Sequence, residues 1–349
     1  MSLQPVSPAA DAIHARHATS PDAPSLPWAL HYVDVAGLKI AVYDSGGPDG
    51  QQLQPPLLLV HSMHAAASAF EWQPLMQRQA RQRRVVAVDL PGCGLSDKPE
   101  LAYTPALMSA AITAAIDWIN AAEVDIAALS LGCEFAALAT LQRPGRVRSL
   151  ALVAPTGMEG RRAHEHHRAG RTRGLHFVRR LLRGNRLGRL LYRVMTTRLM
   201  IHVFMSLTWG TQAYDKALMR QARACAQRPG ASHVALNFIA GTLFSHGIIE
   251  IYRALPVPVW VAHGDQGAFT NFSACPQRTG DAAKGASYAV KREVFEGGAM
   301  PHFEWPDAFN QAYRRFLLSL GPGTLRWQQS RAPQSQSAMT PATWGATAR

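Results

Sequence analysis

Apolar residues in the middle of the chain fall into short continuous runs separated by longer stretches of mixed polarity. We predict that six of these runs are strands, at residues 56–61, 85–90, 126–130, 150–154, 257–263 and 289–295. Runs that are apolar at every position are typical of strands buried on both faces of a parallel sheet. Helices are predicted between them, notably over residues 105–122 and 133–142. This alternation indicates an α/β fold with a mostly parallel central sheet flanked by helices.

Two departures from this alternation shape the domain organisation. Residues 30–47 (LHYVDVAGLKIAVYDSGG) alternate polar and apolar positions, which predicts an antiparallel hairpin that opens the sheet. Residues 157–255 are helical in pattern and rich in arginine, so we expect an inserted cap there. The core then consists of residues 29–156 and 256–320. The flanking segments, 1–28 and 321–349, are poor in core-forming residues and are predicted to be a disordered arm and tail.

The composition excludes several classes of protein. No apolar run approaches the length of a membrane span, and the N-terminus lacks the apolar stretch of a secretory signal. The four cysteines are scattered without a C-x-x-C pair, which argues against a disulfide framework and a zinc site and fits a reducing compartment. We therefore expect a cytoplasmic protein, and no metal or organic cofactor is implied.

The positive charge is concentrated in one segment. Residues 158–200 contain twelve arginines, no lysine and two glutamates, and so account for most of the net charge of +13. The simpler interpretation is a cap helix with a solvated basic face. The alternative is a surface for an anionic partner, such as phospholipid headgroups, an acyl carrier or a phosphorylated or carboxylated substrate. No nucleic-acid-binding motif accompanies the charge, so nucleic acid is not an expected partner.

One short motif carries the candidate chemistry. The predicted strand at 126–130 leads into ALSLG, residues 128–132, directly before a predicted helix. This is close to G-x-S-x-G, the nucleophile elbow, in which a sharp strand-to-helix turn exposes a serine hydroxyl above the sheet. Ser130 could instead be an ordinary helix N-cap. Its position after the third buried strand favours the elbow.

Further segments resemble the α/β-hydrolase superfamily over roughly residues 30 to 320. VVAVDLPGCGLSDKP, 85–99, is similar to the D-x-P-G-x-G-x-S segment of the family, and LLLVH followed by FEW is similar to its oxyanion strand and first helix. The resemblance is to the capped serine-hydrolase branch. It implies that Ser130 is the nucleophile and that the backbone N–H groups of Met63 and Leu131 form the oxyanion hole. A serine in this place argues against dehalogenases and epoxide hydrolases, which use an aspartate.

The same resemblance implies a degenerate catalytic triad. Gly267 stands where the family places its acid, and Ala299 stands where the family places its histidine base. His302, on the same loop as Ala299, is our candidate for the base, although it could be a structural histidine. Asp265 is the candidate for its orienting partner, or else a turn-forming aspartate. Other candidates remain open: His64 or His246 as the base, and Glu134 as an orienting carboxylate or a buried structural one.

These observations predict a hydrolase with a rearranged triad that cleaves an ester or related acyl bond through Ser130. Its substrate would be a small molecule, anionic or acyl-type. The alternative is a catalytically inactive binding or accessory protein with the same fold. A third hypothesis is a peripheral protein whose arginine-rich cap contacts an anionic membrane surface.

Overall fold

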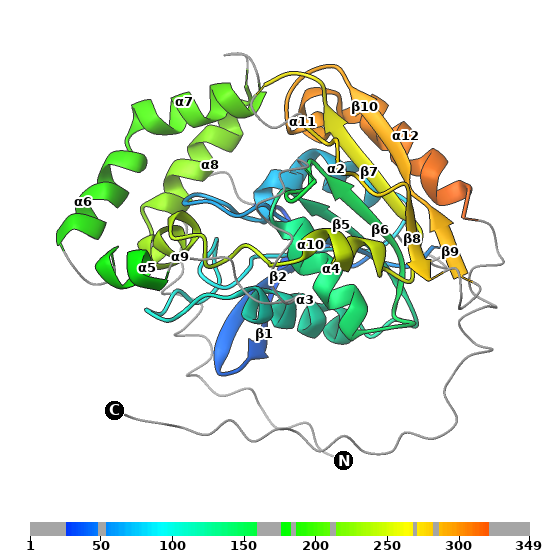
Figure 1. Cartoon of the computed structure of the whole chain (residues 1–349), viewed down its shortest axis with the longest axis horizontal. Helices are drawn as coiled ribbons and strands as arrows, with labels where there is room; N and C mark the ends of the chain where they lie inside the picture. The colour runs from blue at the N-terminus through cyan, green and yellow to red at the C-terminus, as the bar shows by residue number, and fades with distance from the viewer. Residues whose placement is uncertain are drawn as a thin grey trace.

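The computed structural model describes residues 26–47, 54–158, 176–182, 186–209, 214–267, 271–281 and 286–320 (Figure 1). Its centre is an eight-stranded sheet in the order β1-β2-β4-β3-β5-β6-β7-β10. All neighbours from β4 to β10 are parallel. The strands are β1 (Ala29–Val35), β2 (Leu38–Asp44), β3 (Leu57–Val60), β4 (Val85–Val88), β5 (Val124–Leu129), β6 (Val147–Val153), β7 (Val259–Gly264) and β10 (Lys291–Phe295). The predicted fold class is confirmed.

The predicted hairpin forms the antiparallel edge of this sheet. β1 pairs with β2, and β2 pairs in turn with β4, both antiparallel. The two strands turn at Ala36 and Gly37, whose φ angles are 53° and 81°. Two consecutive positive φ angles are what a type I′ hairpin turn requires.

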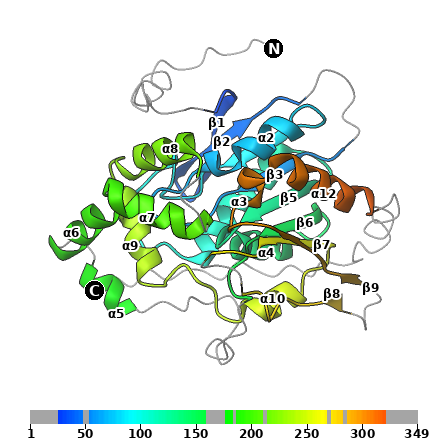
Figure 2. The same cartoon turned by 90° about the horizontal axis from the view of Figure 1, so that it is seen from above.

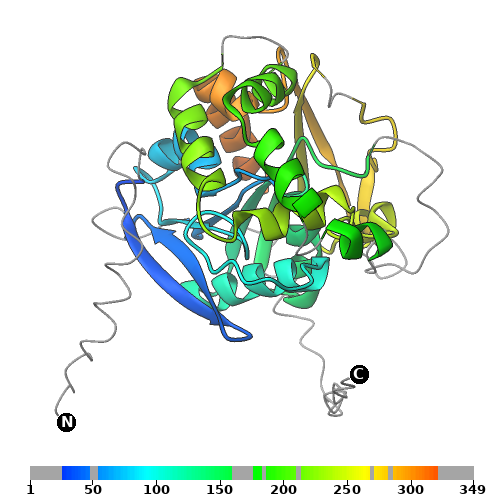
Figure 3. The ribbon, with the colours of Figure 1, turned by 90° about the vertical axis from the view of Figure 1, so that its left-hand side faces the viewer.

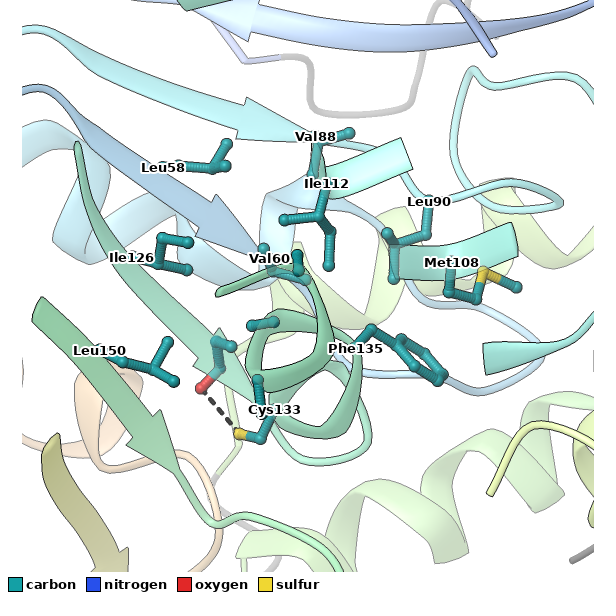
Figure 4. Packing of buried hydrophobic residues seen from close by; sticks show 14 of the residues in the cluster. Leu58, Val60, Val88, Leu90, Met108, Ile112, Ile126, Cys133, Phe135 and Leu150 are labelled. Atoms are coloured by element: carbon teal, nitrogen blue, oxygen red, sulfur yellow. Dashed lines mark hydrogen bonds between the residues drawn. The ribbon is translucent and has the colours of Figure 1, made fainter. Parts of the chain in front are cut away.

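Strands buried on both faces separate two hydrophobic clusters. In β3, Leu58 and Val60 belong to one cluster and Leu57 and Leu59 to the other, as the alternation of a strand demands. The first cluster (Figure 4) contains residues of α3 (Pro105–Ile119), α4 (Gly132–Gln142) and α10 (Ile248–Arg253). The second contains residues of η1 (Ala69–Trp72), α2 (Gln73–Gln79) and α12 (Pro306–Leu318). The uninterrupted apolar runs therefore mark the centre of the molecule.

The segment between β6 and β7 is helical, as its pattern indicates. It contains α5 (His176–Leu182), α6 (Arg186–Met195), α7 (Arg198–Trp209), α8 (Lys216–Ala226), α9 (Ala231–Ile239) and α10. Figures 1 and 2 show α5 to α9 grouped beside the sheet, whereas Ile248 and Ile251 of α10 belong to the first core cluster. The assignment of residues 157–255 as an inserted cap stays a prediction. Residues 159–175 lie outside the described residues.

Two segments differ in detail from the prediction. A small antiparallel sheet of β8 (Arg278–Asp281) and β9 (Ala286–Ala289), which we did not anticipate, separates β7 from β10. Leu26 and Trp28, which we assigned to the N-terminal arm, pack against the second cluster. The rest of the predicted arm, 1–25, and the predicted tail, 321–349, fall outside the described residues. Within the described part of the chain, no helix has the length and apolar character needed to cross a bilayer.

The D-x-P-G-x-G-x-S segment, through Asp89, stabilises the loop after β4 and the start of η1. The Asp89 carboxylate accepts hydrogen bonds from the N–H groups of Ala69 and Leu95, each at 2.7 Å, and from the Tyr43 hydroxyl at 2.9 Å. A Cβ added at Gly94 would come within 1.9 Å of this carboxylate, so only glycine fits there. Through Ala69, Asp89 holds the start of η1, which carries Glu71 and Trp72.

Candidate active site

Ser130 occupies a strained turn between β5 and α4. Its φ of 53° lies in the left-handed region, which is uncommon for a residue other than glycine and is often found at functional sites. Its N–H donates to the Val153 carbonyl at 2.8 Å, which anchors the turn to β6. A Cβ at Gly132 would lie 2.2 Å from the His61 carbonyl oxygen, so the loop after β3 packs directly on the turn. This is the geometry of a nucleophile elbow.

The N-cap alternative does not describe Ser130. The residue at the N-cap of α4 is Leu131, and no side chain caps that helix end. Because the Ser130 hydroxyl is not used to satisfy the helix, it is available to a ligand in the neighbouring pocket.

The backbone N–H groups of Met63 and Leu131 are suited to bind an oxyanion. Both residues are almost fully buried, at 3% and 1% exposure. In the part of the chain that the structure describes, neither N–H donates to a protein acceptor. Buried N–H groups without a partner are rare because they lose the hydrogen bond that water would provide. A ligand oxygen would supply the missing acceptor.

A pocket of about 360 Å³ adjoins Ser130. Its walls come from the loops after β3, β5 and β6 and from helices α7, α8 and α9 of the predicted cap. Ala154, Pro155 and Thr156 line it beside the serine, and Ala154 also has a positive φ, of 44°. The remaining lining is largely apolar and includes Met63, Phe204, Met205, Leu218, Phe238, Phe244, Phe272 and Met300. Such a pocket fits an apolar group better than a charged one.

Glu71 is the principal polar group of the pocket wall, and sequence reasoning missed it. Its buried carboxylate accepts from the Ser62 N–H at 2.8 Å, from the Ser62 hydroxyl at 3.0 Å and from His64 Nε2 at 2.9 Å. Burial alone would raise its pKa, but the hydrogen bonds from His64 and from the Ser62 N–H hold the pKa below its ordinary value. A glutamate between the apolar residues of AFEW was the available signal.

These bonds fix the loop that carries Met63. His64 Nδ1 accepts from the Ala66 N–H at 3.1 Å, so the neutral ring with its proton on Nε2 satisfies both contacts. His64 lines the pocket with Ser130, but both of its ring nitrogens are engaged in this conformation. Glu71 and His64 therefore hold residues 61–66, which we call the oxyanion loop after its predicted role, on both sides of Met63.

His302, our candidate base, lies beneath this loop rather than in the pocket. It belongs to the short helix α11 (Pro301–Glu304) and is fully buried. Its Nε2 donates to the Glu71 backbone oxygen at 2.7 Å, and its ring stacks on Trp72 with centroids 4.4 Å apart. Burial lowers its pKa to about 4. The structure does not bring His302 and Ser130 together, and the base role stays a hypothesis.

Asp265, the candidate acid, is exposed at the end of β7. Its Oδ1 accepts from the Gly297 N–H at 3.0 Å, and its own N–H donates to Phe295 O at 3.0 Å. These contacts join the ends of β7 and β10, which fits the turn-forming alternative. Ser130, His302 and Asp265 are thus not assembled into one triad in this conformation.

Ala299 lines the pocket on the side where the resemblance places a base. Its N–H donates to the Thr208 carbonyl at 2.8 Å, which ties the loop to α7. Gly267 has a φ of 87° in the other loop of the expected triad. Across the residues that the structure describes, no imidazole is hydrogen-bonded to the Ser130 hydroxyl.

The other two candidates contribute little to the pocket. Buried Glu134 accepts from the Thr156 hydroxyl at 2.6 Å and from the Ser245 N–H at 2.7 Å, so it joins α4 to the segment that leads into α10. His246 is not part of the pocket lining. A search of the described residues finds no group of His, Cys, Asp or Glu able to hold a metal ion.

The parallel sheet, the strained serine turn and the helical segment above it define the α/β-hydrolase class of protein. Comparison with known families agrees: residues 57–312 match the model of the alpha/beta hydrolase family, and the chain belongs to that family.

Individual relatives share only a low sequence identity with the chain. The chain is 27% identical over 125 residues to a 2-hydroxymuconate semialdehyde hydrolase of Pseudomonas sp. (strain CF600), a match that covers 35% of this chain and 42% of that protein. A probable hydrolytic enzyme from Pseudomonas aeruginosa PAO1 superposes with a TM-score of 0.63 at 20% identity, covering 84% of this chain and 95% of that one. A meta-cleavage product hydrolase from Pseudomonas fluorescens IP01 gives 0.60 at 18% identity, covering 83% and 98%. Identities this low between the structures support the shared fold alone.

Proposed function

We propose that the protein hydrolyses esters, or closely related acyl bonds, of small apolar molecules through Ser130. The observation that carries this proposal is the combination of a strained serine turn with two buried N–H groups, of Met63 and Leu131, that have no protein acceptor among the described residues. An acyl carbonyl that the serine attacks develops negative charge on its oxygen, and such N–H groups stabilise it. The relative named as a hydrolase is consistent with this chemistry.

Turnover is expected to be slow. Among the described residues no imidazole accepts the Ser130 proton, so general-base assistance from these residues, typically worth about 10²–10⁴-fold, depends on a rearrangement. An oxyanion hole with substrate binding still leaves roughly 10³–10⁴-fold catalysis over water. Esters with a good leaving group are therefore the appropriate substrates for a first assay.

The lining favours an acyl or alkyl group over an anionic one. His64 and Glu71 are the ionisable residues of the pocket wall, and Glu71 would repel a carboxylate or phosphate. Acyl-type substrates therefore fit this pocket better than anionic ones.

The test is a series of p-nitrophenyl esters with acyl chains of increasing length. We expect a rate above buffer that depends on chain length and is abolished by Ser130→Ala. Ser319→Ala, a serine beyond the end of α12, is the matched control and should retain the wild-type rate. Equal rates in wild type and Ser130→Ala would exclude the proposal.

Ala299 favours a second candidate, a binding protein without turnover. An alanine in the wall where a base is expected leaves a pocket that can hold an ester without activating Ser130. This candidate predicts that an ester bound in calorimetry is recovered intact, with the same affinity in Ser130→Ala. Release of alcohol in proportion to enzyme would contradict it.

A further inference from the structure

Two cap helices expose an unusual amount of apolar surface. On α6, Leu187, Leu190 and Val194 are 53%, 59% and 48% exposed; on α7, Leu199, Val203 and Leu207 are 66%, 39% and 53% exposed. We call these six residues the apolar cap face. In Figure 1, α6 lies at the left-hand edge of the molecule and α7 at its upper left, and both are on the side that faces the viewer in Figure 3. Exposed apolar patches of this kind mark sites of protein or membrane interaction.

α7 is apolar on both sides. Ile201, Met205 and Trp209 are buried against the protein, while Leu199, Val203 and Leu207 point to solvent. A helix that is apolar on two opposite sides is normally covered on both of them. The outer side of α7 therefore requires a cover that the protein itself does not provide within the described residues.

Exposed arginines accompany the apolar cap face on the same helices. Arg180, Arg186, Arg189, Arg193 and Arg198 are all exposed on α5, α6 and α7. The sequence contains no Asp or Glu between residues 166 and 214. The partner must therefore be both anionic and able to accept aliphatic side chains.

The combination of exposed aliphatic side chains and arginines fits one kind of partner for this face. A second copy of the chain would set the same arginines against each other, so the face is not complementary to itself. A polyanion would pair with the arginines and leave the leucines in water. The headgroup layer of an anionic bilayer offers negative charge and an apolar boundary together.

We propose that α6 and α7 dock in the plane of an anionic lipid bilayer. The apolar cap face inserts at the boundary between headgroups and acyl chains, and the arginines contact the headgroups. At 10 and 12 residues, both helices are too short to span the membrane. Phe204 of α7 is 39% exposed and also lines the Ser130 pocket, so docking places this part of the pocket wall next to the bilayer.

The test is sedimentation of the full chain with sucrose-loaded vesicles of phosphatidylcholine, alone or with 30% phosphatidylglycerol. Each arginine near an anionic surface contributes about fivefold to the partition coefficient. We expect Arg186→Gln with Arg193→Gln to weaken binding about 25-fold, and Leu190→Ser with Leu199→Ser to weaken it by a similar or larger factor. The matched controls are Arg81→Gln and Leu318→Ser, at exposed positions of the core, which should bind as wild type does.

Several results would overturn the proposal. The first is vesicle binding that does not depend on phosphatidylglycerol, and the second is wild-type protein that stays in the supernatant. The third is binding of the cap variants equal to that of the control variants. A dimer in sedimentation velocity that dissociates in Leu190→Ser would assign the face to a second copy instead. The proposal does not rest on hydrolysis, because Ser130→Ala is expected to bind vesicles as wild type does.

Discussion

His302 provides the sharpest prediction about stability, because its ring is buried and uncharged. Burial lowers its pKa from the ordinary 6.5 to about 4. In the unfolded chain the ring takes up a proton near pH 6.5, whereas in the folded chain it does so only near pH 4. The stability that the folded state gains from keeping this ring neutral is fully present above pH 6.5. It is lost as the pH falls from 6.5 through 4. A shift of this size corresponds to about 3 kcal/mol of unfolding free energy.

The perturbation is His302→Gln, which removes the titration but retains an N–H donor for the Glu71 carbonyl. Urea unfolding between pH 7 and pH 4 measures the free energy of each protein. Wild type should lose about 3 kcal/mol more than the variant over this range. His31→Gln, at an exposed histidine, is the matched control and should follow wild type.

Parallel pH dependence of wild type and His302→Gln would refute the reasoning. The activity of the same variant addresses the base hypothesis separately. A group with a pKa of about 4 is a weak base at neutral pH, so the structural role predicts an ester rate that follows the folded fraction. A fall of about 10²-fold or more in the folded variant would instead assign the base to His302.

Three further predictions concern the site. Gly132→Ala places a Cβ 2.2 Å from the His61 carbonyl oxygen. We therefore expect the unfolding free energy, measured with denaturant, to fall by roughly 3 kcal/mol or more, and ester turnover to be lost. A stable, active variant would contradict the close packing of the turn on the loop after β3. Glu71→Ala leaves the Ser62 and His64 donors without an acceptor and should destabilise the fold by about 3 kcal/mol, with lower kcat in the folded protein; an unchanged kcat would show that the oxyanion loop does not depend on Glu71. Ala299→His puts an imidazole into the pocket wall and should raise ester turnover by about 10-fold or more, an increase that Ser130→Ala must abolish.

The fold was largely predictable because each local signal agreed with its neighbours. The runs at 56–61 and 85–90 became β3 and β4, and the hairpin at 30–47 became β1 and β2. These elements are set by hydrophobic burial and turn chemistry, which act over a few residues. The β8–β9 sheet was missed because its strands, RTGD and ASYA, are short and carry no clear apolar alternation.

At the candidate site, the sequence predicts the local geometry only where the backbone determines it. ALSLG positions Ser130 through local geometry, and the glycine at 132 is required by one close contact with His61. The surroundings of His302 could not be predicted, because its partners are Glu71 and Trp72, more than 200 residues away in the chain. Proximity along the loop placed His302 near the expected base position, but packing directs its ring beneath the oxyanion loop.

The exposure of the apolar cap face could not be predicted from the sequence either. The interleaved arginines and leucines of 175–207 indicate amphipathic helices, but not which side the protein covers. On α7 the aliphatic residues divide between the two sides, with Met205 against the pocket and Leu199 in solvent. Only the packing of the cap reveals that division.

The central claim is that Ser130 is a nucleophile supported by a functional oxyanion hole. The most direct measurement is intact-protein and peptide mass spectrometry after treatment with a fluorophosphonate. We predict one phosphonyl adduct per chain, on the peptide that contains Ser130, and none in Ser130→Ala. Folded wild-type protein that remains unlabelled at long exposure would contradict the claim.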